Sequence, residues 1–305
     1  MKNLLFLAAA LTMWPALNPR VAAQQSACPT CPAQAAAPAL CPAGRIEECP
    51  AEGCGGWDRQ LNCRKNLTCD PSGRAAEQYT LDGIKKLPYP QSWHAGKDRA
   101  ELAALGEGRR VTVTARLLRV DPGPPDSANC KLPGREDRSL LLTLVPDGAL
   151  GKSRVERELV SVTAVLTPRV RRAHRQWTQD SLGRLLSHSA LYVRVTGLLL
   201  LNTEGAPARF EYDKANKTLH AVPTLRATDW EIHPVLELEV CGSKQCAEGG
   251  GWQRLDDVTL PPWRPDHAGR RGKAAEADPE DDTPKVIQPG LYRGQRGRRR
   301  RGRRR

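Results

Sequence analysis

The chain lacks an apolar run that is long enough to cross a bilayer. Its longest apolar stretch, Leu4 to Met13, has about ten residues, whereas a spanning helix needs roughly 20. Lys2 before this stretch and Val21-Ala22-Ala23 after it are typical of an export signal. We therefore expect residues 1–23 to be a signal peptide, with cleavage near Ala23 and a periplasmic or secreted mature protein.

Recognisable catalytic motifs are also missing. The sequence has no His-Glu-x-x-His, no Ser-His-Asp order and no pair of carboxylates at a catalytic spacing. Cys28-x-x-Cys31 has the spacing of zinc ligands, but no second such pair accompanies it. We therefore expect no catalytic residues, no metal and no cofactor.

The chain has ten cysteines, all of which follow the predicted cleavage site. An even number of cysteines in an exported protein favours disulfides over zinc. Cys241 and Cys246 close a short loop after the last predicted strand, so we expect them to pair. The pairing of the other eight remains open at this point.

Positive charge is concentrated at one end. The formal net charge is +13, and residues 291–305 contribute nine arginines and no acid, which leaves +4 for the rest. Arginine binds phosphate and carboxylate through two parallel hydrogen bonds, and the interspersed glycines favour a flexible chain. We predict that residues 264–305 are disordered and that this tail binds polyanions through Arg298, Arg299, Arg300, Arg301, Arg303, Arg304 and Arg305.

Five segments have the alternation of apolar and polar residues that is typical of strands. The first segment begins near Arg110 and the last ends at Val240. A helix is expected at Val170 to His188, between the third and the fourth strand segments. This order predicts a mostly β protein with an OB-fold-like barrel of five strands, and an open α+β sandwich is the alternative. The strands are expected at Arg110–Leu117, Ser139–Val145, Leu159–Leu166, Leu191–Leu201 and Trp230–Val240.

The segments around the barrel differ in composition. Residues 24–50 are rich in Ala, Pro and Cys and are expected to be a disordered linker. Residues 51–109 are expected to be an irregular, Cys-rich segment that packs on the core. We expect the barrel at 110–246 and a short C-terminal extension at 247–263.

Three groups of residues resemble a family of exported bacterial proteins of uncharacterised function. They are Gly53-Cys54-Gly55-Gly56 with Leu61-Asn62 and Lys65-Asn66, then Val193-Arg194-Val195-Thr196-Gly197, then Trp230-Glu231-Ile232-His233-Pro234-Val235. The resemblance covers roughly residues 50–245 and implies the same barrel but no activity. The family has an Asp-x-His at the second strand, where this chain has Asp137-Arg138-Ser139.

Two basic groups are candidate binding residues. The long loop between the fourth and fifth strands contains Arg209, Phe210, Tyr212, Lys214 and Lys217, a mixture that suits stacking on bases or sugars beside phosphate. The alternative is a hairpin whose aromatic residues pack on the barrel. The second group, near the start of the predicted helix, consists of Arg169, Arg171, Arg172 and Arg175. The alternative to a binding role is that these arginines only form the solvated end of the helix.

Glu231, His233 and His174 are a candidate acid–base or metal site, with structural histidines as the alternative. The sequence as a whole predicts an exported, non-catalytic binding module for polyanions such as nucleic acid, an anionic envelope polysaccharide or membrane head groups. Two other hypotheses remain: a secreted hydrolase such as a nuclease, and a structural envelope protein that binds a protein partner.

Overall fold

The fold was analysed in a computed structural model of the chain. The residues that the structure describes are 28, 30–31, 41, 44–54, 58–90, 98–188, 191–202, 204, 208–213, 218–223, 226–241, 246 and 249–263, with only the backbone of 208–213 and 218–223. The predicted signal peptide and the Arg-rich tail lie outside these residues. Trp93, which belongs to the predicted Cys-rich segment, also lies outside them.

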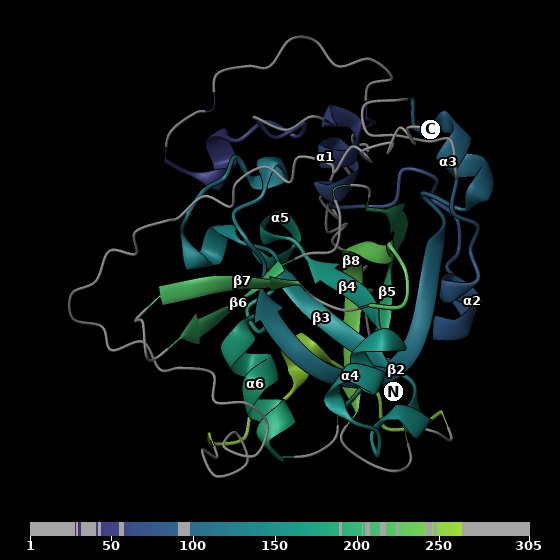
Figure 1. The fold of residues 1–305 in the computed structure, drawn as a ribbon, viewed down its shortest axis with the longest axis vertical. Coiled ribbons are helices and arrows are strands. Elements are labelled where there is room, and N and C mark those ends of the chain that lie inside the picture. The colour runs from purple at the N-terminus through teal and green to yellow at the C-terminus, as the bar shows by residue number, and fades with distance from the viewer. Residues whose placement is uncertain are drawn as a thin grey trace, which may run out of the picture.

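Strands and short helices are interspersed along the described chain as far as β5, and the strands β5 to β9 then follow one another (Figure 1). The strands are β1 Glu77–Tyr79, β2 Arg110–Pro122, β3 Leu140–Val145, β4 Val162–Leu166, β5 Leu191–Leu201, β6 Ala208–Asp213, β7 Thr218–Pro223, β8 Trp230–Cys241 and β9 Gln253–Arg254. The α-helices are α1 Arg59–Lys65, α2 Leu81–Lys85, α3 Ala100–Leu105, α4 Arg154–Leu159, α5 Pro168–Arg171 and α6 Gln179–His188. Single 3-10 turns lie at Ile46–Glu48, Ser127–Asn129, Arg135–Asp137, Asp147–Ala149 and Leu255–Asp257.

Five of the strands form a closed barrel in the order β2-β3-β4-β8-β5, and β5 pairs back with β2. All neighbours are antiparallel except β4 and β8, which are parallel. The helices α5 and α6 connect the third barrel strand to the fourth. This topology is that of an OB-fold, as the sequence predicted.

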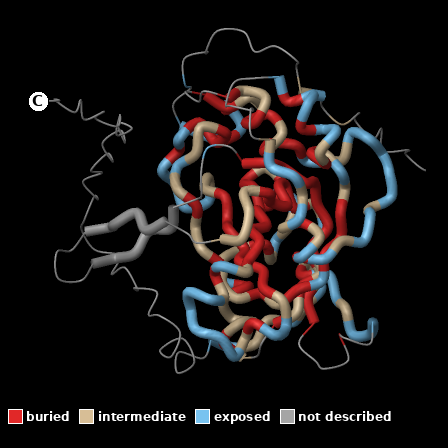
Figure 2. The backbone as a smooth tube through the Cα atoms, turned by 45° about the vertical axis from the view of Figure 1, so that its right-hand side comes forward, coloured by how far each residue is buried: buried red, intermediate tan, exposed pale blue. Residues whose placement is uncertain are grey.

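The barrel interior is filled by the alternate residues of its strands. Val111, Val113 and Ala115 of β2 point into the same core as Val193 and Val195 of β5, and Trp230 is completely buried. Figure 2 shows buried backbone through the centre of the molecule, with exposed segments around it. Each buried aliphatic side chain stabilises the fold by about 1.5–3 kcal/mol.

The predicted third strand begins later than expected. Arg154–Leu159 is helix α4, and β4 starts only at Val162. The reason is a capping box: the backbone N–H of Glu156 donates to Ser153 Oγ, and the backbone N–H of Ser153 donates to the Glu156 carboxylate. This pair starts a helix within a segment whose apolar residues also fit a strand.

The single helix expected at 170–188 is also wrong, because the structure divides it into α5 and α6. Between them, side-chain hydrogen bonds accompany isolated backbone hydrogen bonds. Arg171 Nε donates to the carbonyl of Trp177 at 2.8 Å, and the N–H of Gln176 donates to Asp256 Oδ1 at 3.1 Å. Thr178 then accepts a hydrogen bond from the N–H of Ser181 and starts α6.

Five disulfides pair all ten cysteines, which indicates an oxidising compartment. Cys241 is bonded to Cys246, as the sequence predicted. Cys28 and Cys31 are bonded to different partners, Cys69 and Cys63, so their spacing reflects two disulfides. The other two bonds are Cys41–Cys54 and Cys49–Cys130.

The segments on either side of the barrel contact it. In the predicted linker, Ile46 is buried at 1% exposure and belongs to a small second core with Cys49 and Cys130, so this part of the linker is ordered. At the other end, β9 pairs with β8 and Leu255 is fully buried, as expected for a C-terminal extension. No helix within the described ranges has both the length and the apolar character needed to cross a membrane.

Candidate binding site at the outer wall of the barrel

Strand β8 places Glu231 and His233 on the outer side of the barrel wall. Trp230 and Ile232 point into the core, so the residues that alternate with them face outward. Both are nevertheless buried, with 1% of Glu231 and 4% of His233 exposed. The cover is α1, which packs against β8.

Gly197 allows β5 to approach the bend of β8 beside His233. A Cβ at position 197 would lie 2.3 Å from the carbonyl oxygen of Pro234 and 2.7 Å from Ile232. The ladder between the two strands shifts register on both sides of Gly197. A glycine is therefore required where the backbones of β5 and β8 come closest, and this contact fixes the position of His233.

Glu231 is a buried carboxylate with three partners. Its Oε1 accepts from Asn202 Nδ2 at 2.9 Å and is paired with Arg226, and its Oε2 lies 3.1 Å from His233 Nδ1. Burial acts to raise the pKa of Glu231, but the charge of Arg226 and the His233 contact outweigh it and lower the pKa to about 2. The group is therefore ionised under ordinary conditions.

An ionised carboxylate only accepts hydrogen bonds, so His233 Nδ1 carries the proton in the contact with Glu231. The second ring nitrogen, Nε2, is buried and has no hydrogen-bond partner among the described residues. A carboxylate that fixes one imidazole nitrogen leaves the other available to accept a proton or to bind a ligand. The side chain thus has one structural contact and one unused nitrogen.

Lys65 at the end of α1 continues this polar cluster. Its Nζ lies 2.6 Å from Glu204 Oε2 and 3.1 Å from Asp126 Oδ2, with 3% of the side chain exposed. Burial acts to lower the pKa of Lys65, and the two carboxylates overcome this effect and raise it. Burial likewise acts to raise the pKa of Asp126, but Lys65 and the N–H of Ala128 lower it.

A second buried ion-pair network lies around Arg99, whose side chain is completely buried. Its guanidinium contacts both oxygens of Glu107 at 2.9 and 2.5 Å, Asp58 Oδ2 at 3.0 Å and the carbonyl of Leu201 at 2.6 Å. Glu107 also pairs with Arg64 Nε at 3.1 Å. Asp58 caps α1 by accepting from the N–H of Leu61, so this network fixes the helix over the barrel wall.

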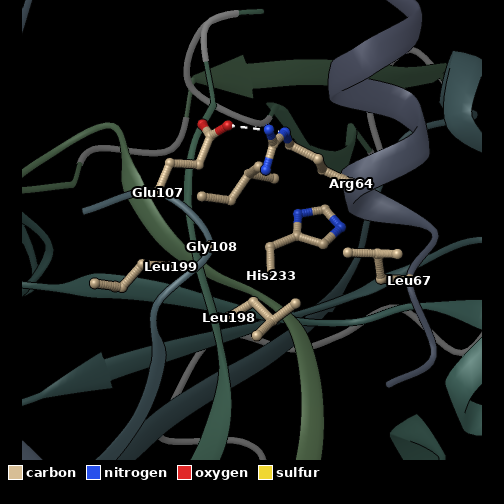
Figure 3. A pocket seen from close by; sticks show the side chains of 8 residues that line it. Arg64, Leu67, Glu107, Gly108, Leu198, Leu199 and His233 are labelled. Carbon is tan, nitrogen blue, oxygen red and sulfur yellow. Dashed lines mark ion pairs between the residues drawn. The ribbon is translucent and has the colours of Figure 1, made fainter. Parts of the chain in front are cut away.

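A small cavity lies between α1 and the outer wall, with about 180 Å³ of empty space that includes its opening to solvent. In Figure 3 the His233 ring lies between Arg64 and Leu67, and the Arg64–Glu107 ion pair lies above it. The residues that line the cavity are Arg64, Leu67, Glu107, Gly108, Leu198, Leu199, Leu200 and His233. None of these lining side chains carries a hydroxyl or a thiol.

The arginines predicted near the start of the helix make internal contacts. Arg169 donates to the carbonyl of Pro50 at 3.0 Å, and Arg172 pairs with Glu47. Arg171 donates to the carboxylate of Glu136 and to the backbone carbonyl of Arg138. Burial lowers the pKa of Arg169 and of Arg171. Arg175 is exposed. Three of the four thus connect the barrel to neighbouring segments.

His174 is not brought together with Glu231 and His233. Its Nδ1 lies 2.6 Å from Asp256 Oδ2, and its ring stacks on Trp177 at 3.9 Å. It therefore binds the C-terminal extension. Within the described ranges no group of three His, Cys, Asp or Glu is arranged to hold a metal ion.

The long loop between the fourth and fifth barrel strands contains the antiparallel pair β6–β7. Arg209, Phe210 and Tyr212 are in β6, of which only the backbone is described, and Lys214 and Lys217 lie outside the described residues. The tail arginines 298–301 and 303–305 also lie outside them. Binding by these residues remains a prediction.

OB-folds usually bind ligands on the outer face of their second and third strands. Here every residue of β3 and of β4 is buried, including the outward-facing Thr143 and Val165. Helix α4 packs against β3. Its Glu158 accepts a hydrogen bond from Arg119 of β2 at 2.7 Å. A ligand that follows the usual OB mode would therefore have to contact the loops.

Comparison of the chain with protein-family models, with curated proteins and with solved structures finds no match. The resemblance noted from the sequence remains a prediction. The second and third of its motif segments lie on paired strands, where Gly197 of β5 lies opposite Val235 of β8.

The sequence singled out Glu231 and His233 but missed Arg64, Lys65, Arg99, Glu107 and Arg226 as their neighbours. The sequence around these residues contains no signal of their burial: Glu107, for example, is flanked by glycines and followed by two arginines, yet it is buried in the structure. Charged residues in such positions are buried only when they are paired.

Proposed function

We propose that the protein is an exported, non-catalytic binding module for polyanions, in which the Arg-rich tail supplies most of the affinity. The observation that carries the proposal is the uneven charge, because residues 291–305 contain nine arginines and no acid in a chain of net charge +13. A flexible cationic segment binds a polyanion by releasing its counterions, without a shaped pocket.

The surface of the barrel supports this division of roles. Arg110 pairs with Glu237, Arg116 with Asp147 and Arg194 with Glu239. These cations on β2 and β5 are neutralised by neighbours, so the outer wall formed by the two strands is not a strongly positive surface. Most of the net positive charge therefore lies in the tail, whose nine arginines supply +9 of the total of +13.

Retention on a heparin column tests the proposal. The full chain should elute at high salt, and a variant with all nine tail arginines replaced by Gln should elute early. A matched Arg→Lys tail keeps the charge and should restore most of the retention. Replacing Glu276, Asp278, Glu280, Asp281 and Asp282 by neutral residues should increase retention. Equal elution of the Gln variant and the wild type would exclude the proposal.

Export is part of the same proposal. Residues 1–23 have the composition of a signal peptide, and the five disulfides require an oxidising compartment. N-terminal sequencing of the mature protein should begin at Gln24. A cytoplasmic protein that retains Met1 and free thiols would contradict it.

One observation favours a second function, that of a secreted hydrolase. The contact between Glu231 and His233 leaves Nε2 free to accept a proton from water. In that case the protein would hydrolyse nucleic acid or a simpler phosphodiester, and His233→Ala would abolish the activity. Unchanged nucleic acid after prolonged incubation with the oxidised, folded protein would exclude this alternative.

A further inference from the structure

The cavity under α1 contains a buried nitrogen without a partner. His233 is 4% exposed, its ring lines the cavity, and its Nε2 makes no hydrogen bond within the described chain (Figure 3). An unpaired buried polar atom costs about 1–3 kcal/mol. A ligand group that contacts Nε2 would remove this cost.

A second buried nitrogen of the same cavity also lacks a hydrogen bond. Arg64 Nε lies 3.1 Å from Glu107 Oε1 as an ion pair, but it makes no hydrogen bond within the described chain. The guanidinium carries its proton at every relevant pH and only donates. About a quarter of the side chain is exposed, at 27%, so Arg64 lies where a ligand can enter.

The two nitrogens suit the same kind of group. Because His233 Nδ1 already carries a proton, protonation of the ring adds an N–H at Nε2, beside the charge of Glu231. The cavity then contains two N–H donors and no unpaired acceptor among its lining side chains. We propose that this cavity binds an oxyanion group, a carboxylate or a phosphate, through the Nε2 of protonated His233 and the guanidinium of Arg64.

The walls of the cavity favour such a contact. Leu67, Leu198 and Leu200 make much of its lining apolar, and hydrogen bonds to charged groups are stronger in such surroundings. Most of the 180 Å³ is open to solvent, and the enclosed part is no larger than one water molecule, so it admits a single oxygen of a ligand whose remainder lies at the opening. Gly108, which has a φ of +81°, forms the rim beside Arg64.

The carboxylates around the cavity are compensated. Glu107 is paired with Arg64 and Arg99, Glu231 is paired with Arg226, and Asp126 is paired with Lys65. An oxyanion near Nε2 therefore does not meet an unpaired negative charge within the described residues. The charged or titratable groups packed around His233 are Glu231, Arg226, Asp229, Lys65, Arg64, Arg99, Glu107, Asp126 and Glu204.

Binding should take up one proton when His233 starts neutral. Linkage then requires the affinity to fall as the pH rises, by at most tenfold for each unit of pH. Glu231 and the guanidinium groups keep their charge throughout this range. The charge of arginine is constant in this range, so anions held by arginine alone should bind with the same affinity at every pH. A pH-dependent affinity therefore indicates an oxyanion held by His233.

The test uses the full-length oxidised protein with ¹⁵N-labelled histidine, titrated with sodium acetate or sodium sulfate between pH 6 and 8.5. Neither probe changes its own charge in this range; acetate represents a carboxylate, and sulfate a tetrahedral phosphate. We expect a saturable shift of the His233 Nε2 resonance with at least one probe, and an affinity that falls as the pH rises across this range. The tail does not contribute to this resonance, so the heparin experiment and this one can fail independently.

Two variants and two controls complete the design. Arg64→Gln should weaken binding about tenfold or more, and His233→Gln should abolish its pH dependence. Arg74→Gln and His188→Gln, outside the cavity, should bind as the wild type does. No shift at His233 with either probe, a shift independent of pH, or full affinity in Arg64→Gln would each overturn the proposal. If His233→Gln does not fold, the wild-type pH series and Arg64→Gln still decide the question.

Discussion

His233 Nδ1 lies 3.1 Å from Oε2 of Glu231, two residues earlier on the same strand. Two such residues share a face of the strand, here the outer face of a barrel wall. The wall is covered by α1, so the pair lies in a buried environment. Its position depends on the ion pairs that hold α1 and on Gly197 beneath the bend of β8.

The pair should make stability depend on acid pH. The folded pKa of Glu231 is about 2, below its ordinary value of 4.5, so its contribution is complete above pH 4.5 and is lost as the pH falls toward 2. The contribution is on the order of 3 kcal/mol. Urea unfolding of Glu231→Gln should show a few kcal/mol less stability at pH 7 and a shallower decline between pH 4.5 and 2.

The matched control for this variant is Glu237→Gln in the same strand. Glu237 pairs with Arg110, but 54% of its side chain is exposed, so the change should stay below about 1 kcal/mol at every pH. A Glu231→Gln protein with the wild-type acid transition would show that the carboxylate is not stabilised by its partners.

Gly197→Ala should destabilise the protein and displace His233. The new Cβ would lie 2.3 Å from the backbone oxygen of Pro234, so β5 and β8 would have to separate. We expect a loss of about 3 kcal/mol or more and a lower melting temperature. Gly151→Ala, where a Cβ meets nothing within 4 Å, should melt within a few degrees of the wild type. Equal melting of the two variants would rule out the close contact.

Arg99→Met should be among the most destabilising single substitutions. It removes the cation that Asp58 and Glu107 share and leaves two buried carboxylates without it. Loss of one partner from a buried ion pair costs about 3–5 kcal/mol. Arg110→Met, which disrupts an exposed pair, should cost about 1 kcal/mol or less by the same denaturation measurement. A small loss in both variants would contradict the network.

The five disulfides should contribute unequally. Cys49–Cys130 spans 81 residues, and Cys241–Cys246 spans five. The entropy of loop closure assigns about 4 kcal/mol to the first and about 2 kcal/mol to the second, before overlap with other bonds is considered. Paired Cys→Ser variants should therefore differ in melting temperature, with the Cys49/Cys130 pair lower. The reverse order would show that native contacts outweigh loop entropy.

The sequence predicted the position of all five barrel strands, although β2 continues five residues beyond the expected end at Leu117, to Pro122. β5 has the expected bounds, and β8 extends one residue further, to Cys241. The break between α5 and α6 could not be predicted in this way, because Gln176 bonds Asp256, 80 residues later in the chain. Local periodicity contains no information about such distant partners.

The candidate site was predicted only in part. Glu231 and His233 were predicted as an acid–base or metal site together with His174, which the structure places elsewhere, beside Asp256. Their neighbours Arg64 and Lys65 belong to a segment that the sequence described as irregular, and it lies over the barrel through contacts and disulfides that span many residues. The basic residues near Arg169 form a cluster in sequence, but in the structure their partners are backbone carbonyls and acids.

The slope of log affinity against log salt for single-stranded DNA tests the functional account most directly. Each phosphate that the protein neutralises contributes about −0.7, so engagement of six to nine tail arginines predicts a slope of about −4 to −6. Replacing the nine arginines of residues 291–305 by Gln should bring the slope near zero. An unchanged slope in that variant would show that the tail is not the binding element and would contradict the account.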